Sequence, residues 1–577
     1  MEAEQYKTVL YNEEWLSYTA YLKNINFEYK LLNLSKKYKN KKILIYGNGI
    51  LFNVICKNYD LNKYLNICAV SDLRYEKDAT TVYNDYKAVK PSLIRNENID
   101  VILITTVNPT EIKNFLLKND FVNKHTIIEP LLQDSFQDKI KYFHKKLQLG
   151  FQYLSKNANI FNFIKYLCFL NSTELQSKIN YINVINNLKK NKERKIRVVF
   201  ICEENQKWGY QSIYDEMKSD ENFEVLPILN LPIITYRRQE FLQGKNIEFF
   251  NSQGMEAIDG YDYENNTYKS LYDLKPDIVF YQQPWYMIQK QIPAVVSNYA
   301  LTCIISYGFT SIDVQSWGSE AIRKNSGNIW RMFTESKYHN NFYQKAASLK
   351  HKDIAITKGY PKLDNYAKPI AQEFESLWKD TNQKDKYRII WAPHHSIEKY
   401  GFEMSNFKEQ YLYFLNFAKK HSEYSFIFKP HPSLRYKCIS ENFLSAEEYD
   451  NYINEWNSLP NATVYDKGNY FDIFKTSDIL ITDSSSFLAE YFYSGKPIIF
   501  FQSQNRAGFN KFGLKIKKGF YELKNTEEVE DLLYDILINK NDKLKTTRYN
   551  IIKKEFYYPK NGIGKNIVDY IKKELGR

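Results

Sequence analysis

The sequence has no long hydrophobic run. None of its apolar stretches approaches the roughly 20 residues that a membrane-spanning helix needs. The residues from Met1 to Tyr6 also lack the basic start and apolar core of a signal peptide. These two absences predict a cytoplasmic protein, either free or attached peripherally to the inner face of the cell membrane.

Cysteine is scarce as well, since the 577 residues contain only six and none of them forms a C-x-x-C pair. Their scatter gives no sign of a disulfide framework or of a thiolate zinc site. The pattern H-E-x-x-H, in which two histidines on one helix face bind zinc, is also missing. We therefore predict no metal-binding residues and no cofactor.

The balance of charge is positive, because 80 Lys and Arg against 67 Asp and Glu give a formal net charge of +13. A positive protein favours anionic partners such as nucleic acid, an anionic membrane, a nucleotide or a polyanionic polymer. The sequence shows no nucleic-acid-binding motif and no concentrated basic helix, so we expect no nucleic acid partner. Two lysine-rich stretches, 511–518 and 540–554, fit either contact with an anionic inner membrane surface or ordinary solvated helix faces.

Short buried strands alternate with helical segments in three blocks of the chain, which is typical of parallel sheets covered by helices. We expect strands at 42–46, 67–70, 100–105, 197–201, 277–281, 302–306, 387–391, 424–428, 478–482 and 497–501. The predicted fold class is therefore α/β. The predicted parts are a Rossmann-like domain at 1–140, a helical linker at 141–195, and two facing Rossmann-like domains at 196–380 and 381–577, with a cleft between the last two.

The first block opens with a strand that runs into Gly47-Asn-Gly49. This resembles the start of a dinucleotide fingerprint, and Asp72 lies near the expected distance for a ribose partner. Phe52, however, occupies the position of the third glycine. A nucleotide site at Gly47, Gly49 and Asp72 and a purely structural Rossmann-like module are both consistent with this pattern.

A hydroxyl-rich turn, Thr-Asp-Ser-Ser-Ser, lies between a predicted strand and a predicted helix in the third block. Asp483 or Ser484 is placed to cap the helix. The free N–H groups of the helix start and the hydroxyls of Ser484, Ser485 and Ser486 can together bind a phosphate. Glu490 is expected on the same helix face as Ser486, where it can meet a ribose hydroxyl. Simple helix capping explains these residues equally well.

Two loops after strands of the third block carry histidines. His431 lies in Lys-Pro-His-Pro at the carboxyl end of a strand, where open α/β sheets bind ligands. With a reference pKa of about 6.5, a histidine there can donate to a phosphate or transfer a proton. Lys429 in the same loop is either a ligand-binding residue or an ordinary exposed charge. The other loop contains His394 and His395, and we expect only one of these adjacent rings to face the cleft.

The second block contributes Tyr307 and Gly308, which directly follow the strand expected at 302–306. This position faces the same cleft from the opposite domain. Gly308 permits a close approach of the backbone to a ligand, although a tight structural turn accounts for it as well.

These motifs, in their order and spacing, resemble those of the CDP-glycerol glycerophosphotransferase family, the bacterial teichoic-acid and capsule polymerases of the glycosyltransferase-B fold. The resemblance runs from about residue 196 to residue 540. It is carried by Lys207-Trp208 with Tyr214, Tyr281-Gln-Gln-Pro284, Tyr307-Gly308, Asn328-Ile-Trp330, Gly359-Tyr-Pro-Lys-Leu-Asp364, Trp391-Ala-Pro-His-His395, Lys429-Pro-His-Pro432, Tyr470-Phe-Asp-Ile-Phe474, Thr482 to Ser486, and Gly495-Lys-Pro497.

The resemblance implies that an acceptor hydroxyl attacks the phosphorus attached to glycerol and that CMP leaves. The CDP-activated donor would be held mainly by the last domain, and the acceptor would be a surface glycan or a lipid-linked polymer. His431 would contact the donor diphosphate and stabilise charge on the leaving phosphate. Ser485 and Ser486 match the serines that bind the donor phosphate. Asp483 and Glu490 match the acidic positions of the same motif.

Two positions depart from the family pattern. Ser484 stands where the family has a tyrosine. Tyr307-Gly308 stands where many members carry a His-Gly pair whose histidine is assigned as the general base, and a tyrosine with a reference pKa near 10 is a poor base at pH 7. The acceptor proton would then go to another residue, such as His394, His395 or Asp313, or the activity would differ from that of the teichoic-acid polymerases.

Two alternatives follow from these departures. The same pair of domains also serves glycosyltransferases that use a nucleotide-sugar donor, because the fold does not fix the chemistry. Release of CMP rather than a nucleoside diphosphate separates the two reactions. The second alternative is an inactive scaffold subunit of a surface-polymer complex, which Tyr307 favours and the retained His431 opposes. The first domain lies outside the resemblance and is similar to nucleotide-sugar-binding domains fused to some polysaccharide enzymes.

Overall fold

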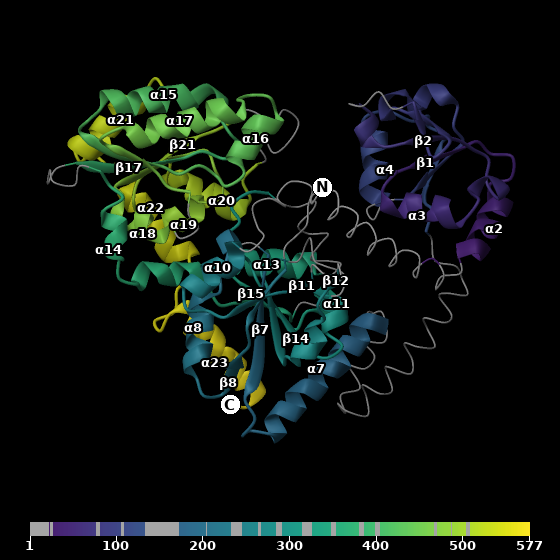
Figure 1. Cartoon of the computed structure of the whole chain (residues 1–577), viewed down its shortest axis with the longest axis horizontal. Helices are drawn as coiled ribbons and strands as arrows, with labels where there is room; N and C mark the ends of the chain where they lie inside the picture. Colours follow the sequence, from purple (N-terminus) through teal and green to yellow (C-terminus); the bar gives the residue numbers. More distant parts are fainter. Residues whose placement is uncertain are drawn as a thin grey trace. The chain divides into compact units, whose positions relative to one another are not determined.

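The computed structural model describes residues 22, 27–76, 81–105, 109–132, 172–203, 205–231, 245–262, 267–283, 291–313, 326–347, 353–379, 386–397, 404–466, 470–485, 487–503 and 508–577. The chain divides into two compact units. The first comprises residues 1–148 and 263–267, and the second comprises 149–262 and 268–577. In Figure 1 the described strands and helices of the first unit are drawn in purple to dark blue, and those of the second run from blue through teal and green to yellow.

The first unit contains a six-stranded sheet with the order β3-β4-β2-β1-β5-β6, in which only β3 and β4 pair antiparallel. Side chains of β1 alternate between two core clusters, because successive residues of a strand point to opposite faces. The sheet is thus buried on both faces, as a Rossmann-like domain requires. Its elements are α2 (Phe27–Lys37), β1 (Ile43–Tyr46), α3 (Ile50–Asn58), β2 (Ile67–Ser71), β3 (Val82–Tyr83), β4 (Tyr86–Val89), β5 (Val101–Ile104), α4 (Pro109–Lys118) and β6 (Ile127–Pro130).

The second unit begins with a parallel eight-stranded sheet whose main path is β10-β9-β7-β13-β14-β15-β16, while β8 pairs with β7. A separate two-stranded sheet joins β11 and β12. The elements of this part are α7 (Ser172–Lys190), β7 (Ile196–Cys202), α8 (Gln211–Ser219), β8 (Phe223–Val225), β9 (Ile228–Asn230), α10 (Lys245–Ser252), β10 (Ala257–Asp259), β11 (Tyr261–Asp262), β12 (Thr267–Tyr268), β13 (Ile278–Tyr281), α11 (Pro293–Val296), β14 (Leu301–Ile305), β15 (Arg331–Thr334), α13 (Lys337–Ala346) and β16 (Ala355–Thr357).

The third sheet, also in the second unit, is parallel with the order β19-β18-β17-β20-β21-β22. This is the doubly wound order, in which the chain starts at the centre and then moves to each edge in turn. Its elements are α14 (Gln372–Glu375), β17 (Tyr387–Ala392), α15 (Phe407–Lys420), β18 (Tyr424–Phe428), α16 (Leu434–Ser440), α17 (Ala446–Ser458), β19 (Ala462–Val464), α18 (Phe471–Thr476), β20 (Ile479–Thr482), α19 (Leu488–Phe492), β21 (Ile498–Phe501), α20 (Lys511–Ile516), β22 (Tyr521–Leu523), α21 (Val529–Leu533), α22 (Lys545–Glu555) and α23 (Ile563–Leu575).

The α/β fold class predicted from the sequence is confirmed, because all three sheets are covered by helices and are mainly parallel. One hydrophobic core cluster joins the last two sheets, since it contains Phe200 and Phe280 of the second sheet together with Ile390 and Phe500 of the third. None of the helices in the described part of the chain is long and apolar enough to cross a membrane.

The segment predicted as a linker contains a packed helix. Residues 133–171 lie outside the described part of the chain, but α7 packs against the part that carries the second sheet. Its Tyr181 hydroxyl donates to the carbonyl oxygen of Asn328 at 2.6 Å, and Leu188 is fully buried. The helix expected in this segment is therefore present at Ser172–Lys190, and it packs against the part of the chain that follows it.

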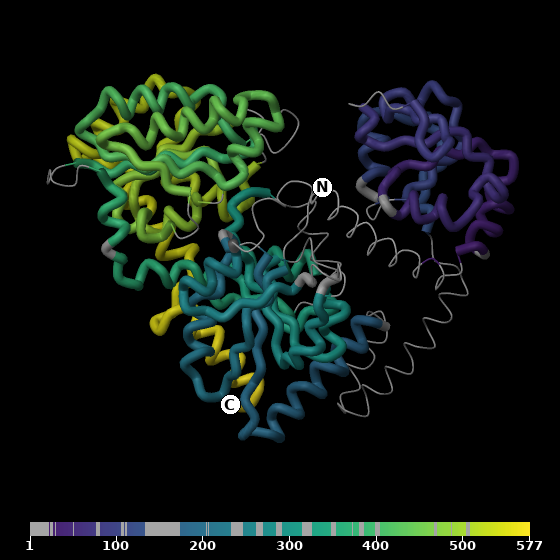
Figure 2. The backbone as a smooth tube through the Cα atoms, viewed as in Figure 1, coloured from purple at the N-terminus to yellow at the C-terminus, as the bar shows by residue number. Residues whose placement is uncertain are grey.

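The carboxyl-terminal helix α23 returns to the first half of the second unit and packs against α8 (Figure 1, Figure 2). The motif Gly359 to Asp364 receives it. Gly359 has a φ of +100°, and a Cβ there would lie 2.8 Å from the Ile563 side chain. The Asp364 carboxylate accepts the N–H groups of Ile563 and Gly564 at 2.9 and 2.8 Å. This part of the family motif therefore binds a helix start rather than a ligand.

We expect Asp364→Ala to lower the free energy of unfolding by about 1–3 kcal/mol, because two buried N–H groups of α23 lose their acceptor. Asp364→Asn should lose less, since it keeps one acceptor oxygen. Urea denaturation measures the difference. The control is Asp569→Ala on the same helix, which removes only an exposed ion pair with Lys565. Equal losses in Asp364→Ala and the control would contradict this role.

Candidate active site

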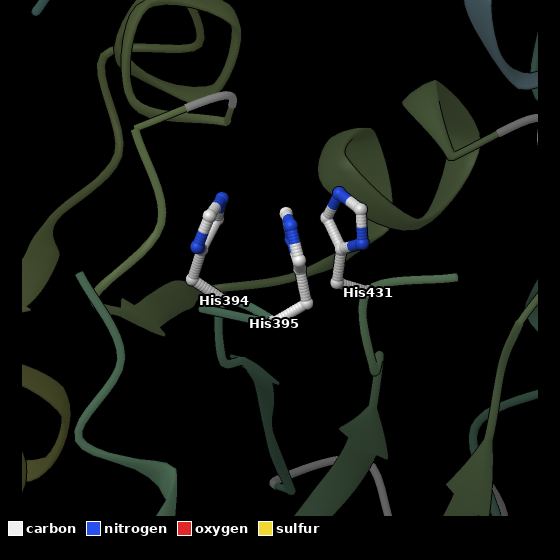
Figure 3. Close-up of side chains that lie close together, drawn as sticks. All are labelled: His394, His395 and His431. Carbon is white, nitrogen blue, oxygen red and sulfur yellow. The ribbon is translucent and has the colours of Figure 1, made fainter. Parts of the chain in front are cut away.

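The three histidines singled out in the third sheet form a row at its carboxyl edge. His394 and His395 follow β17, and His431 follows β18. Their ring centroids are 4.2 Å apart from His394 to His395 and 4.1 Å from His395 to His431. Figure 3 shows the rings side by side, all rising from the strand ends. His394 is buried and His395 is half-buried, so the expectation that only one of the two rings faces the cleft stays a prediction.

Backbone N–H groups orient two rings of this histidine row. The N–H of Ser433 donates to Nδ1 of His431 at 3.1 Å, and the N–H of Ser396 donates to Nδ1 of His394 at 3.2 Å. A neutral imidazole that accepts through Nδ1 carries its proton on Nε2. In their neutral forms both rings therefore carry the proton on Nε2.

The histidine row also bears on the prediction of no metal site. Ligand nitrogens from all three residues lie within 4.8 Å of one another, a spacing that a bound metal ion can draw together. The sequence argument considered only histidines at helical spacing, so it missed a group formed by two strand ends. The absence of a metal stays a prediction.

Lys429 directly follows β18, two residues before His431, and is not the ordinary exposed charge that the sequence allowed. Its side chain is 3% exposed, and its ammonium lies 5.1 Å from the ring centroid of Tyr465 and 5.5 Å from that of Tyr470. Burial lowers the pKa of Lys429 to about 8, with partial opposition from the charge of Asp466. A buried cation beside the histidines favours an anionic ligand.

The hydroxyl-rich turn does not cap a helix in the expected way. Helix α19 begins only at Leu488, with Phe487 as its N-cap. Asp483 instead accepts the N–H groups of His394 and Asn406, each at 2.6 Å. The buried carboxylate thus holds the loop after β17 in place. The capping prediction failed because the carboxylate reaches these N–H groups of the neighbouring strand's loop.

The serines of the turn have different positions. Ser484 is buried, and its N–H donates to the Thr482 hydroxyl at 2.9 Å. Ser485 is half-buried, and its carbonyl oxygen accepts the hydroxyl of Ser311 at 3.3 Å. Ser486 lies outside the described residues. Of the two serines that the resemblance assigns to the donor phosphate, Ser485 is therefore the one that can be placed, and it lies where the two halves of the second unit meet.

Glu490 does not fit the expected role of a ribose partner. It is 2% exposed, and its two oxygens accept the hydroxyls of Tyr360 and Tyr470 at 2.6 and 2.5 Å. Burial raises the pKa of the Glu490 carboxyl, while the positive charge of Lys362 lowers it in part. Both carboxylate oxygens are hydrogen-bonded to buried tyrosines. Glu490 therefore links Tyr360, which follows β16, to Tyr470 in the third-sheet half.

Tyr307 and Gly308 lie at the carboxyl edge of the second sheet, after β14. The Tyr307 N–H donates to the carbonyl of Gln282, and the Tyr307 carbonyl accepts the Tyr360 hydroxyl at 2.6 Å. Gly308 has open space on its Cβ side, because an added Cβ would meet no atom within 4 Å. Asp313, an alternative base, is exposed, and its N–H donates to Gly508.

Two buried polar side chains lie at the same edge, and the sequence analysis missed the first, Glu203, while it included Gln283 only as part of the motif Tyr281-Gln-Gln-Pro284. Glu203 follows β7 and accepts the amide of Gln283 through Oε2 at 2.6 Å, and Gln283 follows β13. Both are at least nine-tenths buried. The signal was available, since each polar residue comes within two positions of a strand end in the place where parallel sheets bind ligands.

The glycine motif of the first unit has part of the expected geometry. Gly47 has a φ of +102° and Gly49 is the N-cap of α3. The Asp72 carboxylate accepts the N–H of Asn48 at 2.9 Å and pairs with Arg74 at 2.8 Å. Asp72 thus orders the glycine loop, and the nucleotide site in this unit stays a prediction.

Two successive Rossmann-like sheets, with histidines, a buried lysine and a hydroxyl-rich turn at a carboxyl edge, define a class of α/β proteins that bind phosphorylated ligands. Residues 280–571, just over half of the chain, match the profile of the family described as CDP-Glycerol:Poly(glycerophosphate) glycerophosphotransferase. The chain belongs to this family.

Two curated relatives are similar to parts of the chain. The minor teichoic acid biosynthesis protein GgaB of Bacillus subtilis (strain 168) is 25% identical over 269 residues, which are 44% of this chain and 25% of that protein. The teichoic acid poly(ribitol-phosphate) polymerase of Bacillus spizizenii is 24% identical over 302 residues, which are 51% of this chain and 42% of that protein. The chain thus matches less than half the length of either relative.

Solved structures show a distant likeness. The wall teichoic acid polymerase TagF is 14% identical, with a TM-score of 0.43 and coverage of 74% of this chain and 98% of that chain. The UDP-GlcNAc 2-epimerase of Neisseria meningitidis, solved with UDP-GlcNAc, is 16% identical, with a TM-score of 0.44 and coverage of 67% and 100%.

We expect Asp483→Ala to destabilise the protein by about 1–3 kcal/mol, since the two N–H groups that it accepts are left without a partner. Amide hydrogen exchange should also become faster in residues 393–397 and 404–406. The control is Asp531→Ala on the exposed side of α21, which should stay within about 0.5 kcal/mol of the wild type. Unchanged exchange in the loop after β17 would show that Asp483 does not hold it.

Proposed function

We propose that this chain transfers a glycerol-phosphate or related polyol-phosphate group from a CDP-activated donor to a hydroxyl of a teichoic-acid-like polymer or another surface glycan. The acceptor oxygen forms a bond to the phosphorus that carries the polyol. The bond from that phosphorus to the bridging oxygen breaks, CMP leaves, and the acceptor proton passes to a base. The observation that carries the proposal is the histidine row with Lys429 at the carboxyl edge of the third sheet.

The donor site is proposed at this edge because its donors suit a diphosphate. The Nε2–H groups of His394 and His431 supply hydrogen bonds, and the buried Lys429 supplies a positive charge. Such donors stabilise the charge that develops on the leaving CMP phosphate. Since an imidazole can also accept a proton, His431 is suited to return one to the leaving group.

The acceptor is proposed to approach from the carboxyl edge of the second sheet. The loop at 307–313 contacts the donor side directly, because the Ser311 hydroxyl donates to the Ser485 carbonyl and the Asn510 amide donates to the carbonyls of Thr310 and Ile312. A hydroxyl bound beside this loop would lie near the phosphorus. Holding both substrates in this way lowers the entropic barrier to transfer.

The proposal includes a cytoplasmic site of action at the inner face of the membrane, where lipid-linked acceptors are available. Exposed lysines of the two basic stretches support it, although some already pair with carboxylates, such as Lys515 with Glu555 and Lys543 with Asp535. Lys553 and Lys554 on α22 are exposed, so their charges would contact anionic lipid headgroups.

Calorimetric titration of CMP, CDP-glycerol, CDP, UDP and GDP into the purified protein tests the donor site. We expect cytidine nucleotides to bind best, and His431→Ala to weaken CDP-glycerol binding about tenfold or more through the loss of a charge-assisted contact. Ser485→Ala and Ser486→Ala should weaken it less. The matched control is His125→Ala, an exposed histidine of the first unit, which should bind like the wild type.

Each outcome decides between the functions. A preference for uridine or guanosine nucleotides would replace the proposal with a nucleotide-sugar glycosyltransferase. Failure of every nucleotide to bind would favour a scaffold subunit. Equal binding by His431→Ala and His125→Ala would remove His431 from the donor site.

Binding should also be linked to proton uptake. At pH 8 Lys429 is about half protonated, because burial lowers its pKa to about 8. A diphosphate beside it raises that pKa, so we expect uptake of up to about half a proton per CDP bound. Titrations in two buffers of different ionisation enthalpy measure this uptake. It should disappear in Lys429→Met, and an unchanged uptake in that variant would place the titrating group elsewhere.

A further inference from the structure

Polar side chains follow four neighbouring strands of the second sheet. Glu203 comes after β7, Gln282 and Gln283 after β13, Ser306 after β14, and Glu335 after β15. These strands are adjacent and parallel, so their carboxyl ends lie at one edge of the sheet. This is the edge that carries Tyr307, where the family pattern has its histidine base.

Glu335 is unusual among these residues. Its side chain is 2% exposed, and neither carboxylate oxygen has a hydrogen-bond partner among the described residues. Burying a carboxylate without partners is costly, so a protein retains such a group chiefly where it acts on a ligand or a proton.

The groups that face Glu335 are phenols and a hydroxyl. Burial is the main cause of the raised pKa of Tyr343 on α13, and the Glu335 charge raises it further. Burial and the Glu490 charge raise the pKa of Tyr360 after β16, and the Glu335 charge adds to them. The Tyr360 hydroxyl in turn donates to the carbonyl of Tyr307. Burial raises the pKa of Glu335 itself to about 7. The Glu335 N–H and the Ser306 hydroxyl lie close enough to lower it in part, but neither has hydrogen-bond geometry toward the carboxylate, and the Ser306 hydroxyl donates instead to the Gly308 carbonyl at 2.8 Å. Glu335 thus lies beside the Tyr307 loop and titrates near neutral pH.

We propose that Glu335 is the general base that removes the proton from the acceptor hydroxyl, within a subsite for a polyol or sugar hydroxyl formed with Gln282 and Tyr307. This inference rests on the proposed transfer reaction. The acceptor O–H proton moves to a Glu335 carboxylate oxygen while the acceptor oxygen bonds to phosphorus and CMP leaves. Glu335 later returns the proton to solvent.

The other members of the subsite suit a hydroxylated ligand. Gln282 has a buried amide nitrogen without a hydrogen-bond partner among the described residues, so it can donate to a ligand oxygen. Its Oε1 is already committed to the N–H of Glu203. Tyr307 is half-buried beside Gly308, whose Cβ side is open. Tyr307 in this arrangement positions the acceptor, and Glu335 replaces the missing histidine as the base.

The test compares the wild type with Glu335→Gln, Glu335→Asp and the control Glu447→Gln, an exposed position on α17. CMP release from CDP-glycerol is measured from pH 5.5 to 9 with a short synthetic glycerol-phosphate oligomer as acceptor, and CMP affinity is measured by calorimetry. We expect Glu335→Gln to lose about 10²–10⁴-fold in kcat with CMP affinity within twofold of the wild type. The fall in wild-type activity below pH 7 should disappear in this variant. Glu335→Asp should be intermediate, because its carboxylate is set back by one methylene.

The outcomes separate this inference from the proposed function. If the wild type releases CMP and Glu335→Gln keeps its rate or its acid limb, Glu335 is not the base and the proposed function stands. If the variant loses CMP affinity together with its rate, Glu335 has a structural role and the inference fails. If the wild type releases CMP neither to the acceptor nor to water, the proposed function fails and the inference fails with it.

Discussion

Parallel pairing of β17 with β18 on one side and β20 on the other is the constraint on which the candidate donor site depends. The register places Trp391 opposite Phe428 and Ala392 opposite Thr482, so the three strands end nearly level. The residues that follow each strand then emerge at one edge. Asp483 completes the arrangement, because its carboxylate accepts two N–H groups from the loop of the neighbouring strand. The site thus combines side chains that are distant in sequence.

A second set of contacts joins this edge to the second sheet. The buried Glu490 carboxylate accepts the hydroxyl of Tyr470, from the third-sheet half, at 2.5 Å. The Tyr360 hydroxyl lies 2.6 Å from the other Glu490 oxygen and 2.6 Å from the carbonyl oxygen of Tyr307, so its single proton is shared between them. A shift of the Tyr307 loop therefore disturbs a buried carboxylate, which is costly to leave without partners. We infer that this network couples the acceptor edge to the donor edge, as a transfer between two bound substrates requires.

Much of the fold could be predicted from the sequence, because runs such as Ile-Leu-Ile-Tyr and Tyr-Ser-Phe-Ile-Phe are short, apolar and followed by polar turn residues. The predicted strands at 42–46 and 424–428 agree with β1 and β18 to within one residue. Predictions from local residue spacing failed at positions where contacts between distant segments determine the structure. Helix α19 starts at Leu488 because Asp483 serves the neighbouring loop, and the motif ending in Asp364 receives α23 from 199 residues further along the chain.

The same limit applies to the candidate site. The position of His431 at a strand end was predictable, since ligands bind at the carboxyl ends of parallel strands. The close approach of the His394 and His395 rings, whose centroids are 4.2 Å apart, was not, because irregular loops have no fixed side-chain period. The buried state of Glu490 and of Glu335 could not be read from residues that look like ordinary surface glutamates. Burial depends on how the sheets pack against each other. It determines whether a carboxylate holds neighbouring hydroxyls, as Glu490 does, or has a raised pKa near neutral pH, as Glu335 does.

In the proposed reaction, the bond between the bridging oxygen of the donor and the phosphorus that carries the polyol breaks, so that CMP is the leaving group. Phosphorus NMR of the reaction of CDP-glycerol with a glycerol-phosphate oligomer tests it directly. The account predicts that the diphosphate signals disappear while a CMP monoester and a new phosphodiester appear in equal amounts. If the diphosphate signals of CDP-glycerol persist, and the protein instead converts a nucleotide sugar to a nucleoside diphosphate, the claim is contradicted and the protein is a sugar transferase.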